Sequence, residues 1–453
     1  MIKSELLDKI EKGPYGPKSK EYFKKSLDIE SLSNVYFSLN EFPPVITKGK
    51  NALVWDLDGK EYIDLASGFS VHNVGHCHPE VVKAIKAQSD NLLQWCAMPN
   101  ELRLQYSTKL VEISPGRSKK KVHLLTSGGE AVEFACSLAR SYKSKPLIMA
   151  FQGCYHGVTG GIINATTHPP FRASNPFLQN IGFVHVPYAY CYRCQFGREY
   201  PDCGMFCTDY IEGLLNNPQA GLSKLAAIIV EPMLGASGYI IPPTEFLTEL
   251  RRITESHDLV LIVDEIQTGG CRSGKMWACE YSNIEPDIMT VAKSIGGGLP
   301  ISAVIGKDVI MDSVGISGSM STFGGTPLSC AAGLASIKVM ETEKLAEKAE
   351  KSGKYLISRL NELAKKHRLI GNVNGRGLFI GVELVRDRKS KEPAGEENIV
   401  LQTECQKRGL LYERGGFYGN IVKFMPSLNI STELIDKAIY ILDQALTVTE
   451  GKK

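Results

Sequence analysis

Short apolar runs alternate with longer amphipathic stretches through the middle of the chain. The apolar runs cover residues 122–125, 147–150, 227–230, 259–263, 288–291 and 303–305. Between the first two, apolar side chains recur at helical spacing at Ala131, Phe134, Ala135 and Leu138. Strands that alternate with helices are typical of a parallel or mostly parallel sheet covered by helices, so we predict an α/β fold.

The two ends of the chain carry different patterns. The first 50 residues are polar and contain four prolines, which predicts an irregular arm that packs across another part of the molecule. Residues 51–65 predict a β-hairpin with Asp58-Gly59 as its turn. After Leu328 a long helical stretch, a strand at 377–384 and an amphipathic helix at 431–446 predict a smaller α+β unit.

These patterns divide the chain into three parts. Residues 1–65 form an N-terminal arm with part of the small domain, 66–328 the large domain, and 329–453 the C-terminal small domain. A chain of 453 residues is long enough for two domains of ordinary size.

Composition narrows the classes of function. Apolar content of 43% and charged content of 22% are typical of a soluble globular protein, and the net charge is only +3. No basic stripe with interleaved aromatics indicates nucleic-acid binding. No apolar run reaches the roughly 18–20 residues that a membrane span requires, and residues 1–23 lack the apolar core of a secretory signal. We therefore expect a cytoplasmic protein that does not bind membranes.

Two ionisable residues stand at the ends of predicted strands, where ligands gather in α/β sheets. Asp264 ends one apolar run and Lys293 follows another. A buried aspartate needs a countercharge, and the protonated ring nitrogen of pyridoxal phosphate (PLP) would supply it. A lysine whose pKa is lowered can form an imine with the same cofactor. The alternatives are a strand-end or helix-capping aspartate and an exposed loop lysine.

Three further segments fit the same ligand. Ser127, Gly128 and Gly129 follow a strand and open a helix, where free N–H groups and the helix dipole bind phosphate. The alternative is a tight turn capped by serine. Tyr155 follows the next strand and could stack on a flat ring, or be a core tyrosine. Near Asp264, Gln267 could donate to the phenolic oxygen and Ile266 could pack opposite Tyr155.

In combination these segments resemble the class-III aminotransferases, which are PLP enzymes of fold type I. The resemblance runs from about Pro44 to the C-terminus. It rests on segments 55–64, 75–79, 127–131, 155–157, 231–232, 264–269, 292–294 and 322–327.

The resemblance implies a set of site residues. Lys293 would be the Schiff-base lysine and Asp264 the partner of the pyridine nitrogen, and the other cofactor-binding positions would be Ser127, Gly128, Gly129, Tyr155, His156, Glu231, Ile266, Gln267 and Thr322. In this family the residue at Thr322 reaches the phosphate of the neighbouring subunit. The resemblance therefore implies a homodimer with shared active sites.

The implied reaction moves an amino group from an ω-amino acid or related primary amine to a 2-oxo acid. Alternatives on the same fold are an amino-acid racemase or epimerase, a decarboxylating transaminase, or a regulatory protein without catalysis. Relatives that use 4-aminobutyrate carry arginine, glutamate and arginine where this chain has Val158, Ala236 and Lys423. The tail is more similar to the dialkylglycine decarboxylase branch. Arg414 is a candidate replacement anchor, or a solvated loop arginine.

Four of the twelve cysteines stand close together in the chain, at Cys191, Cys194, Cys203 and Cys207. Two close pairs of this kind can form a tetrahedral zinc site. The alternative, which the sequence alone favours, is four reduced thiols in a surface excursion. We assign no metal ligand from the sequence.

Overall fold

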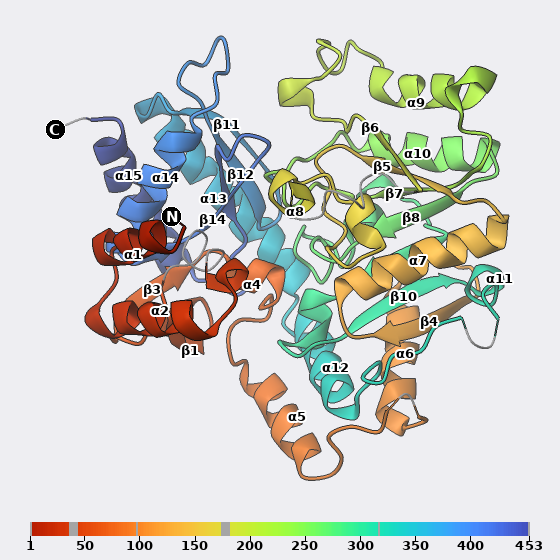
Figure 1. Ribbon diagram of the computed structural model, residues 1–453, viewed down its shortest axis with the longest axis horizontal. Coiled ribbons are helices and arrows are strands. Elements are labelled where there is room, and N and C mark those ends of the chain that lie inside the picture. The colour runs from red at the N-terminus through yellow and green to blue at the C-terminus, as the bar shows by residue number, and fades with distance from the viewer. Residues whose placement is uncertain (1, 36–43, 97, 174–181, 316–317, 452–453) are drawn as a thin grey trace.

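The computed structural model describes residues 2–35, 44–96, 98–173, 182–315 and 318–451. Its centre, within these residues, is a seven-stranded sheet with the order β4-β10-β9-β8-β7-β5-β6 (Figure 1). Only β10 runs antiparallel to its neighbours, and the other pairs are parallel. The strands are β4 (Lys120–Leu125), β5 (Leu147–Phe151), β6 (Phe183–Val186), β7 (Leu225–Val230), β8 (Val260–Asp264), β9 (Ile288–Val291) and β10 (Ser302–Lys307).

This architecture confirms the predicted α/β fold, and all six apolar runs are strands of the central sheet. The sequence prediction missed β6, in which only the first and last residues are buried. Helices α7 (Gly128–Lys143) and α10 (Glu245–Ser256) pack against the sheet. On α7 the predicted apolar face, Ala131, Phe134, Ala135 and Leu138, is buried in the core.

The helices that surround the sheet vary greatly in length. They are α4 (Ser67–Ser70), α5 (Pro79–Ser89), α6 (Glu101–Ile113), α8 (Pro169–Ala173), α9 (Phe206–Asn216), α11 (Asp308–Met311) and α12 (Pro327–Thr342). Short 3-10 turns include η3 (Cys191–Arg193) and η6 (Lys293–Gly296).

Two smaller sheets lie beside the central one. The first has the order β1-β2-β3-β13, from β1 (Ile46–Lys50), β2 (Leu53–Asp56), β3 (Glu61–Asp64) and β13 (Leu410–Leu411). The second has the order β11-β12-β15-β14, from β11 (Ile370–Arg376), β12 (Phe379–Leu384), β15 (Ile421–Phe424) and β14 (Glu413–Gly415). Helices α13 (Leu345–Lys366), α14 (Gly395–Lys407) and α15 (Thr432–Thr449) complete this region.

The predicted hairpin is present as β2 and β3, and its second strand joins the C-terminal part of the chain. Leu410 pairs with Ile63 and Leu411 with Asp64, in parallel. The predicted C-terminal helix is α15, which begins after Ser431, whose hydroxyl accepts the N–H of Leu434.

The prediction of an irregular N-terminal arm was wrong for the residues that the structure describes. They form α1 (Ile2–Lys12) and α2 (Pro17–Ile29), whose apolar side chains make a separate small core. Leu6 and Ile10 on α1, and Phe23 and Leu27 on α2, stand four residues apart, which is the spacing of one helical face. The many lysines around them obscured this helical spacing in the sequence. Residues 36–43 of the predicted arm lie outside the described residues.

A buried arginine joins distant parts of the chain around the sheet edge. Arg272 is fully buried and donates to Asn73 Oδ1 at 2.5 Å, Ser70 Oγ at 3.0 Å and the carbonyls of Leu378 and Pro426 at 3.1 and 2.5 Å. Burial lowers the pKa of its guanidinium to about 9. These bonds tie the segment after α4 and the C-terminal sheets to the loop that follows β8.

Every helix in the described part of the chain is too short or too polar to span a lipid bilayer.

Candidate active site

The two ionisable residues predicted at strand ends meet at one edge of the central sheet. Strands β8 and β9 are parallel neighbours, with Asp264 opposite Thr290. Asp264 is the last residue of β8 and only 4% exposed. Lys293 follows Ala292 just beyond β9 and opens η6 with a left-handed φ of 51°. A lysine in this uncommon conformation is held there by its surroundings.

Asp264 is oriented by two donors. His156 Nδ1 lies 2.7 Å from Asp264 Oδ2, and the N–H of Ile266 donates to Asp264 Oδ1 at 3.0 Å. Since a carboxylate only accepts, Nδ1 of His156 carries the proton. Burial acts to lower the pKa of His156, but Cys154 and Asp264 outweigh it and raise that pKa well above the ordinary value. The two carboxylate oxygens keep further acceptor capacity for a ligand.

The amine of Lys293 forms neither a hydrogen bond nor an ion pair within the described residues. Desolvation lowers its pKa to about 8, while the charges of Glu413, Asp264 and Glu231 partly oppose that shift. The pKa is therefore lower in the folded chain than its ordinary value of 10.5. In the cofactor-free protein the charged amine destabilises the fold below about pH 8, and this penalty is relieved as the pH rises from 8 towards 10.5. An amine of this kind is poised to act as a nucleophile.

The first turn of α7 offers the predicted phosphate cradle. Ser127 caps the helix by accepting the N–H of Glu130 at 3.3 Å, and the Glu130 carboxylate accepts the N–H of Ser127 at 2.7 Å. The N–H groups of Gly128 and Gly129 have no partner within the described residues. A Cβ on Gly128 would lie 3.0 Å from Ile266 Cδ1, so the loop after β8 passes directly beside the cradle.

The structure also brings together three of the remaining predicted residues. Glu231 accepts the N–H of Tyr155 at 2.8 Å and the N–H of Gly235 at 2.9 Å. Gln267 lies against the same turn, because a Cβ on Gly235 would stand 1.9 Å from Gln267 Oε1. Burial raises the pKa of Glu231 to about 7, although His156 and the two N–H groups counteract it. Glu231 thus orients the backbone that carries Tyr155.

Thr322 lies apart from this group, on the surface. Its carbonyl accepts the side-chain amide of Gln94 at 2.9 Å, and the neighbouring Ser321 Oγ is 3.2 Å from Thr126 Oγ1. Within the single chain Thr322 is exposed.

A buried ion pair that the sequence prediction missed lies near Lys293. Lys423 on β15 pairs with Glu413, which stands directly opposite on β14. Lys423 is 1% and Glu413 6% exposed, and Tyr239 donates to Glu413 Oε2 at 3.2 Å. Arg414 points the other way, as the next residue of a strand must, and donates to Gln402 at 2.7 Å. The alternation of side chains along a strand around residue 413 could have predicted that Glu413, and not Arg414, faces the site.

These groups fit PLP. Free helix N–H groups suit its phosphate, a buried carboxylate with spare acceptor capacity suits its protonated ring nitrogen, and an unpaired amine with a lowered pKa suits its aldehyde carbon. The glycines leave space for close approach, since a Cβ on Gly157 would lie 2.8 Å from Gly129 Cα. Fold and site together define a PLP enzyme of fold type I.

Comparison with known proteins specifies the family. Residues 37–446 match the model of the class-III aminotransferases. A leucine/methionine racemase of Thermococcus litoralis is 38% identical over 414 residues, covering 90% of this chain and 92% of the relative. A diaminobutyrate–2-oxoglutarate aminotransferase of Haemophilus influenzae is 35% identical, covering 91% and 92%. A PLP-bound amine transaminase from an uncultivated Pseudomonas species superposes with a TM-score of 0.83 at 27% identity, covering 89% and 95%.

The chain belongs to the class-III aminotransferase family and is a PLP-dependent enzyme.

Proposed function

We propose that this enzyme transfers an amino group from an ω-amino acid or related primary amine to a 2-oxo acid. The observation that carries the proposal is the unpaired, desolvated amine of Lys293 beside the strand-end carboxylate of Asp264. Bound PLP would supply a ring that accepts electrons from the substrate carbon. We assign the roles below to residues of this chain.

Lys293 Nζ would hold the cofactor covalently in the resting enzyme, and the incoming amine would free it. The freed amine would take the proton from the nitrogen-bearing carbon of the donor in one half-reaction, and would deliver a proton to the former carbonyl carbon of the 2-oxo acid in the other. A pKa near 8 suits both directions near neutral pH. Asp264, oriented by His156, would keep the ring nitrogen protonated, and Tyr155 and Ile266 would hold the ring between them.

We further propose that the Glu413–Lys423 pair distinguishes the two substrates. When the pair is closed, the charge of Lys423 is neutralised, which suits a donor without a carboxylate at that end. When a 2-oxo acid binds, its carboxylate replaces Glu413 on Lys423. In relatives that use 4-aminobutyrate, a glutamate at position 236 pairs with the substrate-binding arginine. Here position 236 is an alanine, and Glu413 takes that role. The two segments lie side by side, since the N–H of Gly416 donates to the Ala236 carbonyl at 3.4 Å.

Aromatic side chains near this pair favour an apolar donor. Phe417 stacks on Tyr190 with ring centroids 5.8 Å apart, and a Cβ on Gly153 would stand 2.5 Å from Phe417 Cζ. Ser237, next to Ala236, donates to the Gly153 carbonyl. Val158, where 4-aminobutyrate-using relatives have arginine, is exposed and offers no charge.

The test compares n-butylamine with 4-aminobutyrate, which differ by one carboxylate, as donors to pyruvate and 2-oxoglutarate. We expect wild-type kcat/KM to be higher for n-butylamine. In Glu413→Gln, Lys423 is left unneutralised, and the ratio of kcat/KM for 4-aminobutyrate over n-butylamine should rise about tenfold. Removal of both charges in Lys423→Met/Glu413→Gln should raise the KM of the 2-oxo acid about tenfold or more, with the n-butylamine half-reaction nearly unchanged.

Glu347→Gln, which alters an exposed glutamate on α13, is the matched control and should leave both ratios unchanged. An unchanged ratio in Glu413→Gln contradicts the role of the pair. If no amine in a broad panel aminates either 2-oxo acid, the transaminase function itself is wrong.

Racemisation of an apolar amino acid is the second candidate, and the similarity to a leucine/methionine racemase supports it. A closed Glu413–Lys423 pair suits an apolar side chain equally well. The two functions separate when the enzyme is incubated with one amino acid in deuterated water without a 2-oxo acid. A racemase incorporates deuterium at the α-carbon and keeps its cofactor in the aldehyde form, whereas a transaminase converts the cofactor to its amine form and stops.

We propose that the enzyme is a cytoplasmic homodimer with shared active sites. All twelve cysteines are free, which supports a reducing compartment. Two adjoining surface segments, the described residues 92–96 and 98–104 and residues 320–323, expose large apolar side chains, among them Trp95 (53%), Met320 (80%) and Phe323 (57%). Gln94 donates to the Thr322 carbonyl in the second segment at 2.9 Å, and Asn100 donates to the Gly325 carbonyl just beyond it at 3.4 Å. An apolar patch of this kind marks a protein interface, and Thr322 lies within it.

Trp95→Ser/Phe323→Ser should convert the dimer into a monomer, because it removes two large apolar contacts from the centre of the patch. Size-exclusion chromatography with light scattering measures the mass. The monomer should also bind PLP at least about tenfold more weakly, since the Thr322 of the neighbouring subunit is lost from the phosphate site. Val309→Ser, an exposed apolar residue outside the patch, is the control. A double variant that stays dimeric would place the interface elsewhere.

A further inference from the structure

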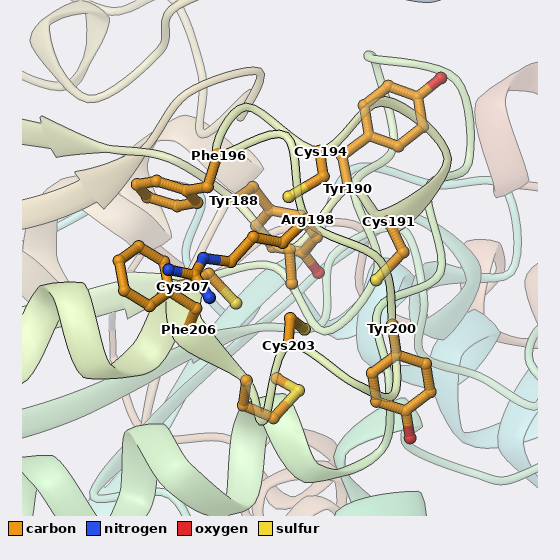
Figure 2. A pocket seen from close by; sticks show the side chains of 12 residues that line it. Tyr188, Tyr190, Cys191, Cys194, Phe196, Arg198, Tyr200, Cys203, Phe206 and Cys207 are labelled. Atoms are coloured by element: carbon orange, nitrogen blue, oxygen red, sulfur yellow. The ribbon is translucent and has the colours of Figure 1, made fainter.

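The four clustered cysteines converge on one pocket. Cys191, Cys194, Cys203 and Cys207 all line it, together with the rings of Phe196 and Phe206 (Figure 2). Cys191 lies within electrostatic range of Cys194 and Cys203, and Cys207 within range of Cys191 and Cys203. Segments separated by up to 16 positions thus present their thiols to a common space.

The segment that carries these thiols contains little regular secondary structure. Between β6 and α9 the only regular element within the described residues is the 3-10 turn η3. From Cys191 to Cys207, Met205 is the single buried hydrophobic side chain. The local bonds are tight turns, from Gly197 N–H to the Cys194 carbonyl at 3.1 Å and from Phe206 N–H to the Cys203 carbonyl at 3.1 Å. Irregular segments of this kind are where structural zinc ions commonly supply a cross-link.

We propose that Cys191, Cys194, Cys203 and Cys207 bind one structural Zn²⁺. Two cysteines separated by two residues and two separated by three match the ligand spacing of tetrahedral thiolate sites. Thiolate sulfur binds zinc well, whereas magnesium and calcium prefer oxygen ligands. None of the four is in a disulfide.

The thiols must move slightly to bind the metal. Among the described residues no three histidine, cysteine or acidic side chains already form a metal-ligand group. Rotation about the Cα–Cβ bonds of residues that line the same small pocket is sufficient to change which way each sulfur points. Three of the four thiols are only partly buried, and Cys191 is exposed, so these side chains are free to turn and a metal can reach them.

The zinc cross-link would order a loop that contacts the region of the active site. Tyr190 and Arg193, which flank Cys191, both donate to the buried carboxylate of Glu383 on β12. Strand β12 in turn pairs with β15, where Gly381 stands opposite Lys423. Zinc would therefore fix the loop against the sheet that positions the Glu413–Lys423 pair, while taking no part in the chemistry.

The experiment uses the full-length enzyme purified without a metal-affinity step. Elemental analysis should find about one zinc per chain. Cys203→Ser/Cys207→Ser should reduce that content at least about fivefold, whereas Cys77→Ser, at an exposed cysteine outside the pocket, should not. A chelator should lower the melting temperature of the wild type by several degrees and leave that of the double variant unchanged.

Cobalt provides a second measurement that is independent of activity. Reduced, metal-free protein titrated with Co²⁺ should show thiolate-to-cobalt charge transfer and the d–d bands of tetrahedral coordination, both absent from the double variant. The proposal is overturned if the reduced protein holds no zinc and gives no such bands. It is also overturned if the metal found is iron, or if zinc content survives loss of all four cysteines.

Discussion

Replacement of Lys293 by alanine is expected to lower kcat by at least about four orders of magnitude. The variant loses both the covalent attachment of PLP and the only described amine that stands unpaired beside Asp264. Single-turnover measurements of each half-reaction, followed by the absorption of the cofactor, test the expectation. Both half-reactions should slow, since the same amine moves the proton in each direction.

Lys224→Ala is the matched control, because Lys224 is an exposed lysine that precedes β7. It should keep kcat within about twofold of the wild type. Circular dichroism and melting curves establish that Lys293→Ala is folded. In the cofactor-free state the variant should be the more stable protein at pH 7, since it no longer buries a charged amine whose pKa is lowered. Turnover above about 1% of wild type would refute the assignment of Lys293.

Asp264→Asn should lower kcat/KM about a thousandfold while keeping the shape of the side chain. The amide carries no charge, so it cannot keep the ring nitrogen of PLP protonated, and it leaves the proton of His156 Nδ1 with a weaker acceptor. Steady-state kinetics at saturating PLP separate this effect from weaker cofactor binding. In Asp264→Asn the ring would therefore accept electrons less well.

Asp264→Glu retains the carboxylate on a longer side chain and should recover part of the lost activity. Asp258→Asn is the neutral control, because Asp258 is exposed and its left-handed backbone tolerates asparagine. A loss of less than tenfold in Asp264→Asn would mean that this carboxylate does not govern the charge of the ring.

Much of the fold could be predicted from the chain because apolar periodicity reports burial directly. Runs such as 259–263 and 288–291 are fully buried strands, and the polar residues that end them lie at one edge of the sheet. The first turn of α7 was equally readable, since Ser127 and Glu130 form a capping box within four residues. Local chemistry and burial agree at these positions.

Other features depend on contacts that no local pattern contains. Glu413 and Lys423 are ten residues apart, yet they pair because β14 and β15 lie antiparallel in a particular register. A shift of one residue would have presented Arg414 instead. The N-terminal helices were missed because four apolar side chains among many lysines only become a core when two helices pack together.

The α/β class, the strand ends that carry Asp264 and Lys293, and the resemblance to a PLP-dependent family could all be read from the residues in order. Those features follow from short-range periodicity and from residue types whose chemistry is specific. The folded chain was needed to show that His156 orients Asp264, that Glu413 neutralises Lys423, and that four cysteines line one pocket. Each of these depends on side chains from separate elements that meet after the chain has folded, and the strength of such charge contacts is set by the burial around them.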